Sequence, residues 1–129
     1  MAQRLEDLDV WRLADSIRRQ VHAIVAARSN SLDRRFCSQM TDAASSVPRN
    51  VAEGFGRYRH KEFARFVDIA RGSAFEVQDL TRDGIIRGYW TDADVADLVA
   101  CCARTIAALT SFGRYLKTHP DPKPSRSKH

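Results

Sequence analysis

The chain has 129 residues, of which 43% are hydrophobic and 29% are charged, and its formal net charge is +5 at pH 7. This length and composition fit one globular domain and exclude an intrinsically disordered chain, which would contain fewer apolar residues. A membrane-spanning helix needs about 20 consecutive apolar residues, whereas the longest stretch without Asp, Glu, Lys or Arg is Thr105–Gly113.

Four stretches of the chain repeat apolar residues at helical spacing, and no stretch alternates for long enough to predict a strand. The stripes are Val10, Leu13, Ala14, Ile17, Val21, Ile24 and Val25; Phe36, Met40, Ala43, Val47 and Val51; Phe63, Phe66, Val67, Ala70, Ala74, Val77 and Leu80; Val95, Leu98, Val99, Cys102, Ile106, Leu109 and Leu116. Because no single stripe can be buried alone, the pattern predicts an all-α protein, an antiparallel up-down four-helix bundle over residues 1–118. Thr91 and Asp94 have the spacing of a cap for the fourth helix.

Pro48 lies inside the second stripe, where a proline removes one backbone hydrogen bond at a cost of about 3 kcal/mol. One interpretation is a break, with Pro48 as the first residue of a short fifth helix. The apolar spacing continues unbroken from Phe36 to Val51, and this favours a single second helix that is kinked at Pro48.

Residues 119–129 differ from the rest of the chain in composition. They hold three of the four prolines, together with Lys, Ser and His, and four of the five net positive charges fall within residues 114–129. We therefore expect a disordered basic C-terminal tail. Nucleic acid or an acidic surface can use such a tail, although a small solvated tail is the commoner explanation.

The cysteines and the first residues predict a cytoplasmic protein that is not associated with a membrane. Three cysteines, Cys37, Cys101 and Cys102, cannot form a full disulfide framework and suit a reducing compartment. The N-terminus turns acidic at Glu6 and Asp7 and shows no signal-peptide pattern.

Several motifs carry a resemblance to a known family. They are Val47–Arg57 (VPRNVAEGFGR), Lys61-Glu62-Phe63, Arg65-Phe66, Ile69–Ser73, Glu76, and near the start Asp7-Leu8 and Val10-Trp11. Across residues 5–116 the chain resembles the four-helix bundle family named after 23S rRNA intervening sequences, which is similar to the accessory variability proteins of diversity-generating retroelements. Relatives often have Ser or Thr before Lys-Glu-Phe as a cap for the third helix, where this chain has Tyr58-Arg59-His60.

The resemblance implies a small cytosolic bundle that assembles into a ring-like homo-oligomer, a pentamer, with no known catalytic residues in most members. For the retroelement branch it implies binding to nucleic acid and to a reverse transcriptase.

The polar and small residues of the central motif have two interpretations. The motif comprises Pro48, Asn50, Glu53, Gly54 and Gly56. A functional interpretation makes Asn50 and Glu53 a binding or acid–base pair. A structural interpretation, which we favour, has Asn50 donating hydrogen bonds near the proline, Glu53 pairing with an arginine one turn away, and the glycines ending the helix.

The turn after this motif gathers cations and an aromatic ring. The candidate nucleic-acid-binding residues are Arg57, Tyr58, Arg59, His60, Lys61 and Arg65. Such a set can hold phosphates and stack a base. The alternative is a solvated turn whose charges are partly offset by Glu62 and Asp68. Repetition of the turn around a ring would sum its field and favour nucleic acid.

Side chains on two helices are expected to point away from the core. On the first helix, Trp11 and His22 share such a face with Asp15 and Arg18. The candidate oligomer-interface residues are Trp11, His22, Ala64, Phe75 and Ile86. Scattered surface residues are common, but two such sets on different helices favour a heterologous contact between copies.

Three functions are compatible with the sequence. The leading hypothesis is a non-enzymatic, homo-oligomeric adaptor that binds RNA, DNA or a nucleic-acid-processing partner, and the second is a protein-binding scaffold ring. The third is a ribonuclease that uses Arg18 and His22. We expect no metal, because no Glu has a His three residues later and there is no Cys-x-x-Cys pair, and we expect no cofactor, because a Gly-rich phosphate loop is missing.

Overall fold

The computed structural model describes residues 4–122 and contains no strand in that range. A short 3-10 helix, η1 (Leu5–Asp7), precedes α1 (Asp9–Ala27), α2 (Arg34–Phe55), α3 (His60–Ile86) and α4 (Ala96–Thr118). The predicted all-α class with four helices is therefore confirmed.

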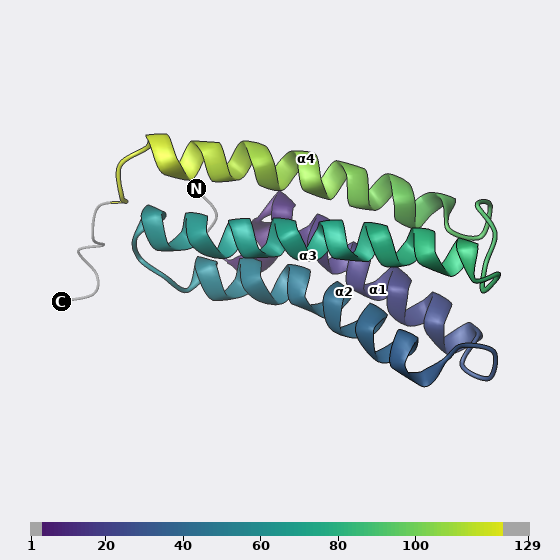
Figure 1. Cartoon of the computed structure of the whole chain (residues 1–129). Coiled ribbons are helices and arrows are strands. Elements are labelled where there is room, and N and C mark those ends of the chain that lie inside the picture. The colour runs from purple at the N-terminus through teal and green to yellow at the C-terminus, as the bar shows by residue number, and fades with distance from the viewer. Residues whose placement is uncertain (1–3, 123–129) are drawn as a thin grey trace.

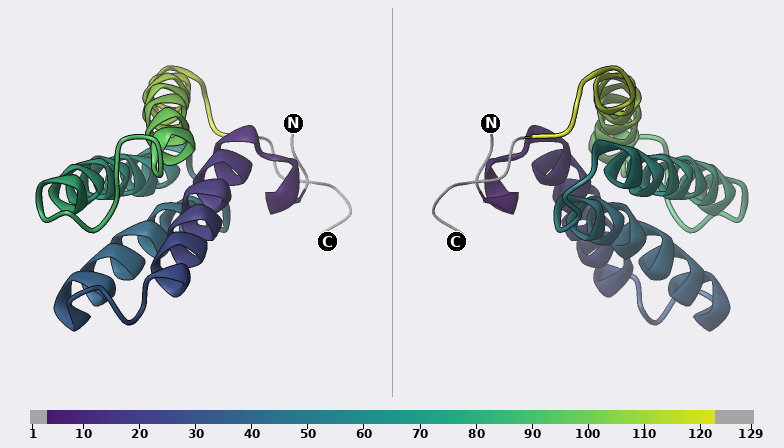
Figure 2. Two further views of the ribbon diagram at one scale, coloured as in Figure 1. Left: turned by 90° about the vertical axis from the view of Figure 1, so that its right-hand side faces the viewer. Right: turned by 90° about the vertical axis from the view of Figure 1, so that its left-hand side faces the viewer.

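The four helices pack around one shared core (Figures 1 and 2). α1 and α3 each contact both α2 and α4. In Figure 1, α3 runs from left to right and α4 returns, so the α2–α3 turn and the carboxyl end of α4 lie at the same end of the bundle. We call this the turn end, and it carries most of the candidate binding residues.

α2 is one continuous helix through Pro48, so the alternative with a fifth helix that begins there is wrong. The helix starts at a side-chain cap, where the Phe36 N–H donates to Asp33 Oδ2 at 3.0 Å. All five residues of its predicted stripe are buried, on both sides of the proline. This burial offsets the missing hydrogen bond of Pro48, because burying an aliphatic side chain contributes about 1.5–3 kcal/mol. A kink at Pro48 stays a prediction.

Two residues on α3 and α4 lie differently from expectation. The sequence pattern predicts Ala64 on the surface, but it is 3% exposed and belongs to the core. The pattern also places Val99 in the fourth stripe, but it is 42% exposed. Both lie beside a stripe rather than opposite it, where helical spacing alone assigns burial poorly.

The connection from α3 to α4 is built on Gly88 and Trp90. Gly88 has φ +79°, and the N–H groups of Gly88 and Tyr89 donate to the Ile85 and Gly84 carbonyls, which is a Schellman termination of α3. Trp90 is 3% exposed, and its indole N–H donates to the Thr81 carbonyl at 2.8 Å. Its ring covers Gly84, so α3 and the connection approach closely there.

Thr91 and Asp94 form the reciprocal hydrogen bonds of a capping box. The Thr91 N–H donates to Asp94 Oδ2 at 2.9 Å, and the Asp94 N–H donates to Thr91 Oγ1 at 3.2 Å. The box closes a turn that leads into α4, which itself begins later, at Ala96.

α4 is long and apolar enough to cross a membrane by length and composition alone. Its buried face packs in the bundle through Leu98, Cys101, Cys102, Thr105, Leu109, Gly113 and Leu116. A core helix of a soluble protein meets the same criterion, so this composition alone does not indicate a membrane span. Of the predicted tail, residues 123–129 lie outside the described residues.

We predict that Gly84→Ala destabilises the protein by about 1–3 kcal/mol, because a methyl group there would lie 2.3 Å from two ring atoms of Trp90. Gly72→Ala is the matched control, since Gly72 is also inside α3 but has nothing within 4 Å of an added Cβ. It should stabilise by up to about 1 kcal/mol. Urea unfolding followed by circular dichroism measures both, and equal effects would contradict the packing of Trp90 on Gly84.

Candidate functional site

The exposed cations of the α2–α3 turn and the first turns of α3 are Arg57, Arg59, Lys61 and Arg65. Arg57 already has partners within the protein, since its guanidinium donates to Glu53 Oε2 at 2.9 Å and lies 5.1 Å from the centre of the Phe66 ring. Within residues 4–122, no ion pair involves Arg59, Lys61 or Arg65. These three side chains are therefore available to an anionic partner.

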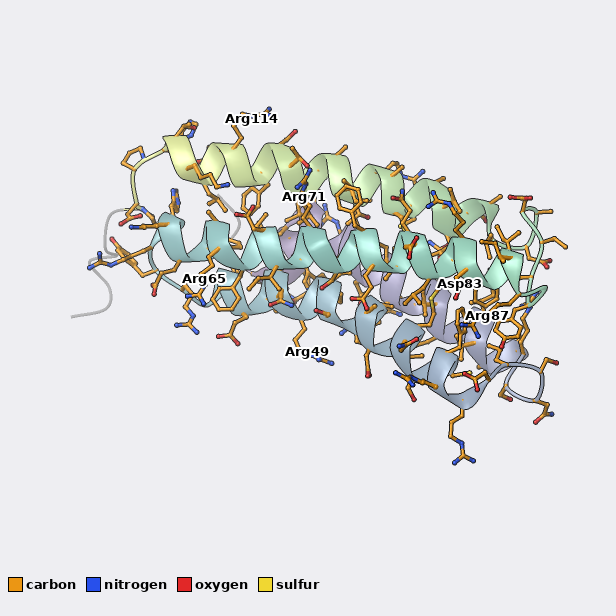
Figure 3. The ribbon with its side chains drawn as sticks, in the orientation of Figure 1. Arg49, Arg65, Arg71, Asp83, Arg87 and Arg114 are labelled. Carbon is orange, nitrogen blue, oxygen red and sulfur yellow. The ribbon has the colours of Figure 1, made fainter. Side chains whose placement is uncertain are left out.

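One further cation extends this surface. Arg49 on α2 is exposed, and Figure 3 shows its side chain projecting from the same side of the bundle as Arg65 on α3. Arg114 on α4 projects from the opposite side. Arg49 is not among the sequence-predicted binding residues, because residues 16 positions apart are brought to one side only by the packing of α2 on α3. Arg49 follows Val47 of the predicted stripe by two positions and therefore lies on the other side of the helix, which could have suggested its exposure.

Tyr58 and His60 are engaged by the C-terminal segment, residues 119–122. Tyr58 is 50% exposed, and its hydroxyl donates to the Pro122 carbonyl. His60 is only 6% exposed, and its Nδ1 lies 3.1 Å from the His119 carbonyl. The imidazole of His60 is therefore unavailable to a phosphate, which corrects its place in the candidate set, while the Tyr58 side chain stays half-exposed.

The amino end of α3 is capped from outside the helix. Arg59 occupies the N-cap position but makes no side-chain cap, as expected from the absence of Ser or Thr there. Instead the His60 N–H donates to Asp121 Oδ1 at 2.8 Å. A carboxylate at this place also stabilises the positive end of the helix dipole, typically by about 0.3–1 kcal/mol. The C-terminal segment thus supplies the cap that the local sequence lacks.

The hydrogen bonds of Asn50 and Glu53 in α2 agree with the structural interpretation of the central motif, and the two side chains are not bonded to each other. Asn50 Nδ2 donates to the Ser46 carbonyl at 2.8 Å and to Ser46 Oγ at 2.9 Å, and Ser46 Oγ lies 2.8 Å from Ser73 Oγ on α3. Glu53 accepts from Arg57, one turn away. Asn50 therefore stabilises α2 and, through Ser46, its contact with α3. Glu53 pairs with Arg57 at the end of α2.

The two glycines of the motif do different things. Gly56 is the residue at which α2 ends, as predicted. Gly54 lies inside α2, so the expectation that it ends the helix is wrong. A Cβ at Gly54 would lie 2.5 Å from Phe63 Cδ1, and the glycine therefore permits the close approach of α3. Pro48, the remaining residue of the motif, is buried together with the predicted stripe of α2.

The residues expected at an oligomer interface do not form a single exposed surface, because some of them are buried. Phe75 and Ile86 on α3 are 44% and 76% exposed, and Ile69 on the same helix is 44% exposed. Trp11 is half-buried and packs against the core, whereas Ala64 is buried in it. Phe75 and Ile86 are thus the accessible apolar residues of this set.

The remaining polar residues of α1 are paired within the protein. His22 is exposed, and its Nε2 lies 3.3 Å from Ser45 Oγ on α2. Asp15 is 7% exposed and accepts from Arg18 Nε at 3.1 Å and from Arg19 Nε at 2.7 Å. Burial raises the pKa of Asp15, but the hydrogen bonds and charges of the two arginines outweigh burial and place this pKa below its usual value of 3.8.

The cysteines and acidic residues offer no metal centre in the part of the chain from 4 to 122, where no three His, Cys, Asp or Glu side chains come together. Cys37, Cys101 and Cys102 are free thiols. Burial, with the neighbouring Cys101, raises the pKa of Cys102 to about 12. Cys102 therefore stays a neutral core residue at physiological pH.

A protein-family model described as "23S rRNA-intervening sequence protein" matches residues 6–111, which span α1, α2, α3 and most of α4. No curated protein matches the chain. The matched range contains the turn with its exposed cations, whereas Asp121 and Pro122 lie beyond it.

We predict that Asp15→Asn lowers the free energy of unfolding by about 1 kcal/mol at neutral pH, because it removes the charge that Arg18 and Arg19 share. Since folding lowers the pKa of Asp15, its contribution is complete above the unfolded value of 3.8 and is lost as the pH falls through the folded value.

Urea unfolding of both proteins from neutral to acidic pH measures this difference. The gap in unfolding free energy should narrow as the pH falls below 3.8. Asp42→Asn is the control, because Asp42 is exposed and, among the described residues, takes part in no ion pair. A gap for Asp15→Asn that does not change with pH would contradict this assignment.

Proposed function

The chain belongs to the 23S rRNA-intervening sequence protein family, and we propose that it is a non-enzymatic, homo-oligomeric adaptor of the cytoplasm that binds nucleic acid at its turn end. The observation that carries this proposal is a set of exposed cations that make no ion pair with any described residue, Arg59, Lys61 and Arg65, next to the half-exposed Tyr58 in the turn. Cations of this kind bind phosphates, and an aromatic face adds base stacking.

The placement of the cations and of the Tyr58 ring suits a single-stranded nucleic acid, which offers both phosphates and unpaired bases. Arg59 and Lys61 lie at the amino end of α3, and Arg65 follows Lys61 by one helical turn. Arg49 continues the surface on α2. Arg57 contributes less, because Glu53 already offsets its charge. The cations are thus spread over the amino end of α3 and the same side of α2, which suits a phosphate backbone better than an isolated anion.

The homo-oligomer is supported by the exposed apolar side chains of α3. Ile69, Phe75 and Ile86 are large and solvent-accessible in the single chain, and contact between copies would remove them from water. A ring, which we propose to be a pentamer, repeats the basic turn at each copy and raises the avidity for a long anionic strand. A reverse transcriptase is the partner that the retroelement resemblance implies.

A protein-binding scaffold is the second candidate function, favoured by the same exposed apolar residues of α3. The ribonuclease alternative has less support, because Arg18 is bonded to Asp15 and His22 contacts Ser45. Salt dependence distinguishes adaptor from scaffold, because contacts with phosphates release counterions and weaken steeply as salt is added.

We predict that the triple variant Arg59→Gln, Lys61→Gln, Arg65→Gln binds a short fluorescent single-stranded RNA more weakly than the wild type does. Each lost phosphate contact should also reduce the slope of log affinity against log salt by about 0.7. Fluorescence anisotropy over a series of salt concentrations measures both quantities.

The matched control is Arg34→Gln with Arg35→Gln, two exposed arginines at the start of α2, at the other end of the bundle. This variant should keep the affinity and the slope of the wild type. Equal losses of affinity per removed charge in the two variants would show binding by overall charge alone, and an unchanged slope in the triple variant would exclude the turn end as the site.

A further inference from the structure

A pocket of about 640 Å³ opens at the turn end, and most of its wall is aromatic. Phe55 comes from α2, Phe63 from α3, and Phe112 and Tyr115 from α4. The ring centres of Phe55 and Phe63 are 6.4 Å apart, those of Phe63 and Phe112 are 5.1 Å apart, and those of Phe112 and Tyr115 are 6.2 Å apart. The rings therefore form one continuous aromatic surface, and of the exposed cations of the turn only Arg57 lines this pocket.

The protein's own C-terminal segment is bound at this pocket. Pro122 is half-buried and lines it, and the Pro122 carbonyl accepts from the Tyr58 hydroxyl. Just before it, the Asp121 carboxylate accepts from the His60 N–H at 2.8 Å. Three features of an extended peptide are recognised in this way: an acidic side chain, the following proline ring, and the carbonyl of that proline.

The segment reaches the pocket without joining the core. It leaves α4 at Thr118, and His119 has extended backbone angles, φ −117° and ψ 142°. Asp121 remains exposed although its carboxylate is bonded. Attachment rests on a few contacts at the surface, so an external segment with the same chemistry can compete for them. A segment tethered this closely has an effective concentration in the millimolar range, which sets the affinity a competitor must overcome.

The surroundings of the pocket favour an acidic peptide. Arg57, Arg59 and Lys61 are exposed beside it, and opposite charge steers association and selects partners. Aromatic grooves are typical binding sites for proline-containing segments, because proline fixes the extended backbone and lowers the entropy lost on binding. The charge and the aromatic wall therefore select for the same kind of sequence.

We propose that this pocket docks an extended segment of a partner protein in which an acidic residue is followed directly by proline, and that Asp121-Pro122 is its internal competitor. Docking removes the C-terminal segment from the pocket and places the partner's carboxylate on the His60 N–H. An adaptor needs one surface for nucleic acid and one for protein, and this pocket is the second, which shares Tyr58 with the first. It does not depend on the nucleic-acid proposal.

The test uses the full chain with Asp121→Ala and Pro122→Ala, and a fluorescent peptide with the sequence of residues 118–122. Because the internal competitor is removed, the variant should bind the peptide about tenfold more tightly than the wild type does. Tyr58→Phe added to this variant should weaken binding roughly threefold to tenfold, since one hydrogen bond is lost. A peptide with alanine in place of its aspartate should bind more weakly as well.

Two controls keep the result interpretable. Circular dichroism checks that the variants remain helical, and Pro122→Ala alone, which keeps the Asp121 cap, should give a smaller gain in the same direction. Equal peptide affinity of variant and wild type, or no saturable binding to either, would overturn the proposal. A gain for a short single-stranded RNA but not for the peptide would also overturn it and assign the pocket to nucleic acid. Arg65→Gln alone, which removes a cation that the peptide argument does not use, tests the nucleic-acid proposal separately.

Discussion

The capping of α3 is the interaction on which the geometry of the turn end depends. The first N–H groups of any helix lack partners inside it, and neither Arg59 nor its neighbours provide a side-chain cap. Asp121 provides one from a position 61 residues further along the chain. This bond draws the C-terminal segment back across the end of the bundle, where it covers His60 and contacts Tyr58. Lys61 and Arg65 are left facing solvent.

One end of a small bundle thereby presents two surfaces of different chemistry. The basic surface follows the outside of α3, and the aromatic pocket lies between the ends of α2, α3 and α4. The core beneath them is closely packed, since Gly54 lets α3 approach α2, and Trp90 closes the opposite end over Gly84. A closely packed core of this kind holds both surfaces in a fixed relation, which the proposed adaptor role requires.

The sequence predicted what depends on local periodicity and spacing. The apolar stripes indicated four helices. The bond from Arg57 to Glu53 was expected because it joins residues one turn apart, and Asn50 was expected to donate hydrogen bonds near Pro48. The burial of His60 was not predictable, because it depends on Asp121 and the His119 carbonyl, which are far away in the sequence. Small residues were ambiguous for a different reason: Ala64 and Gly54 are compatible with a surface, a helix end or a tight contact, and only the partner helix decides.

Light scattering after size exclusion tests most directly whether copies of the basic turn are assembled to bind nucleic acid. The purified wild type, with nucleic-acid and protein absorbance recorded before nuclease treatment, should elute as a particle of several protomers that carries nucleic acid. The variant Phe75→Asp with Ile86→Asp should give a smaller particle, because both side chains are exposed on the proposed contact surface. A wild type that is a monomer and free of nucleic acid would contradict the proposed assembly and its function.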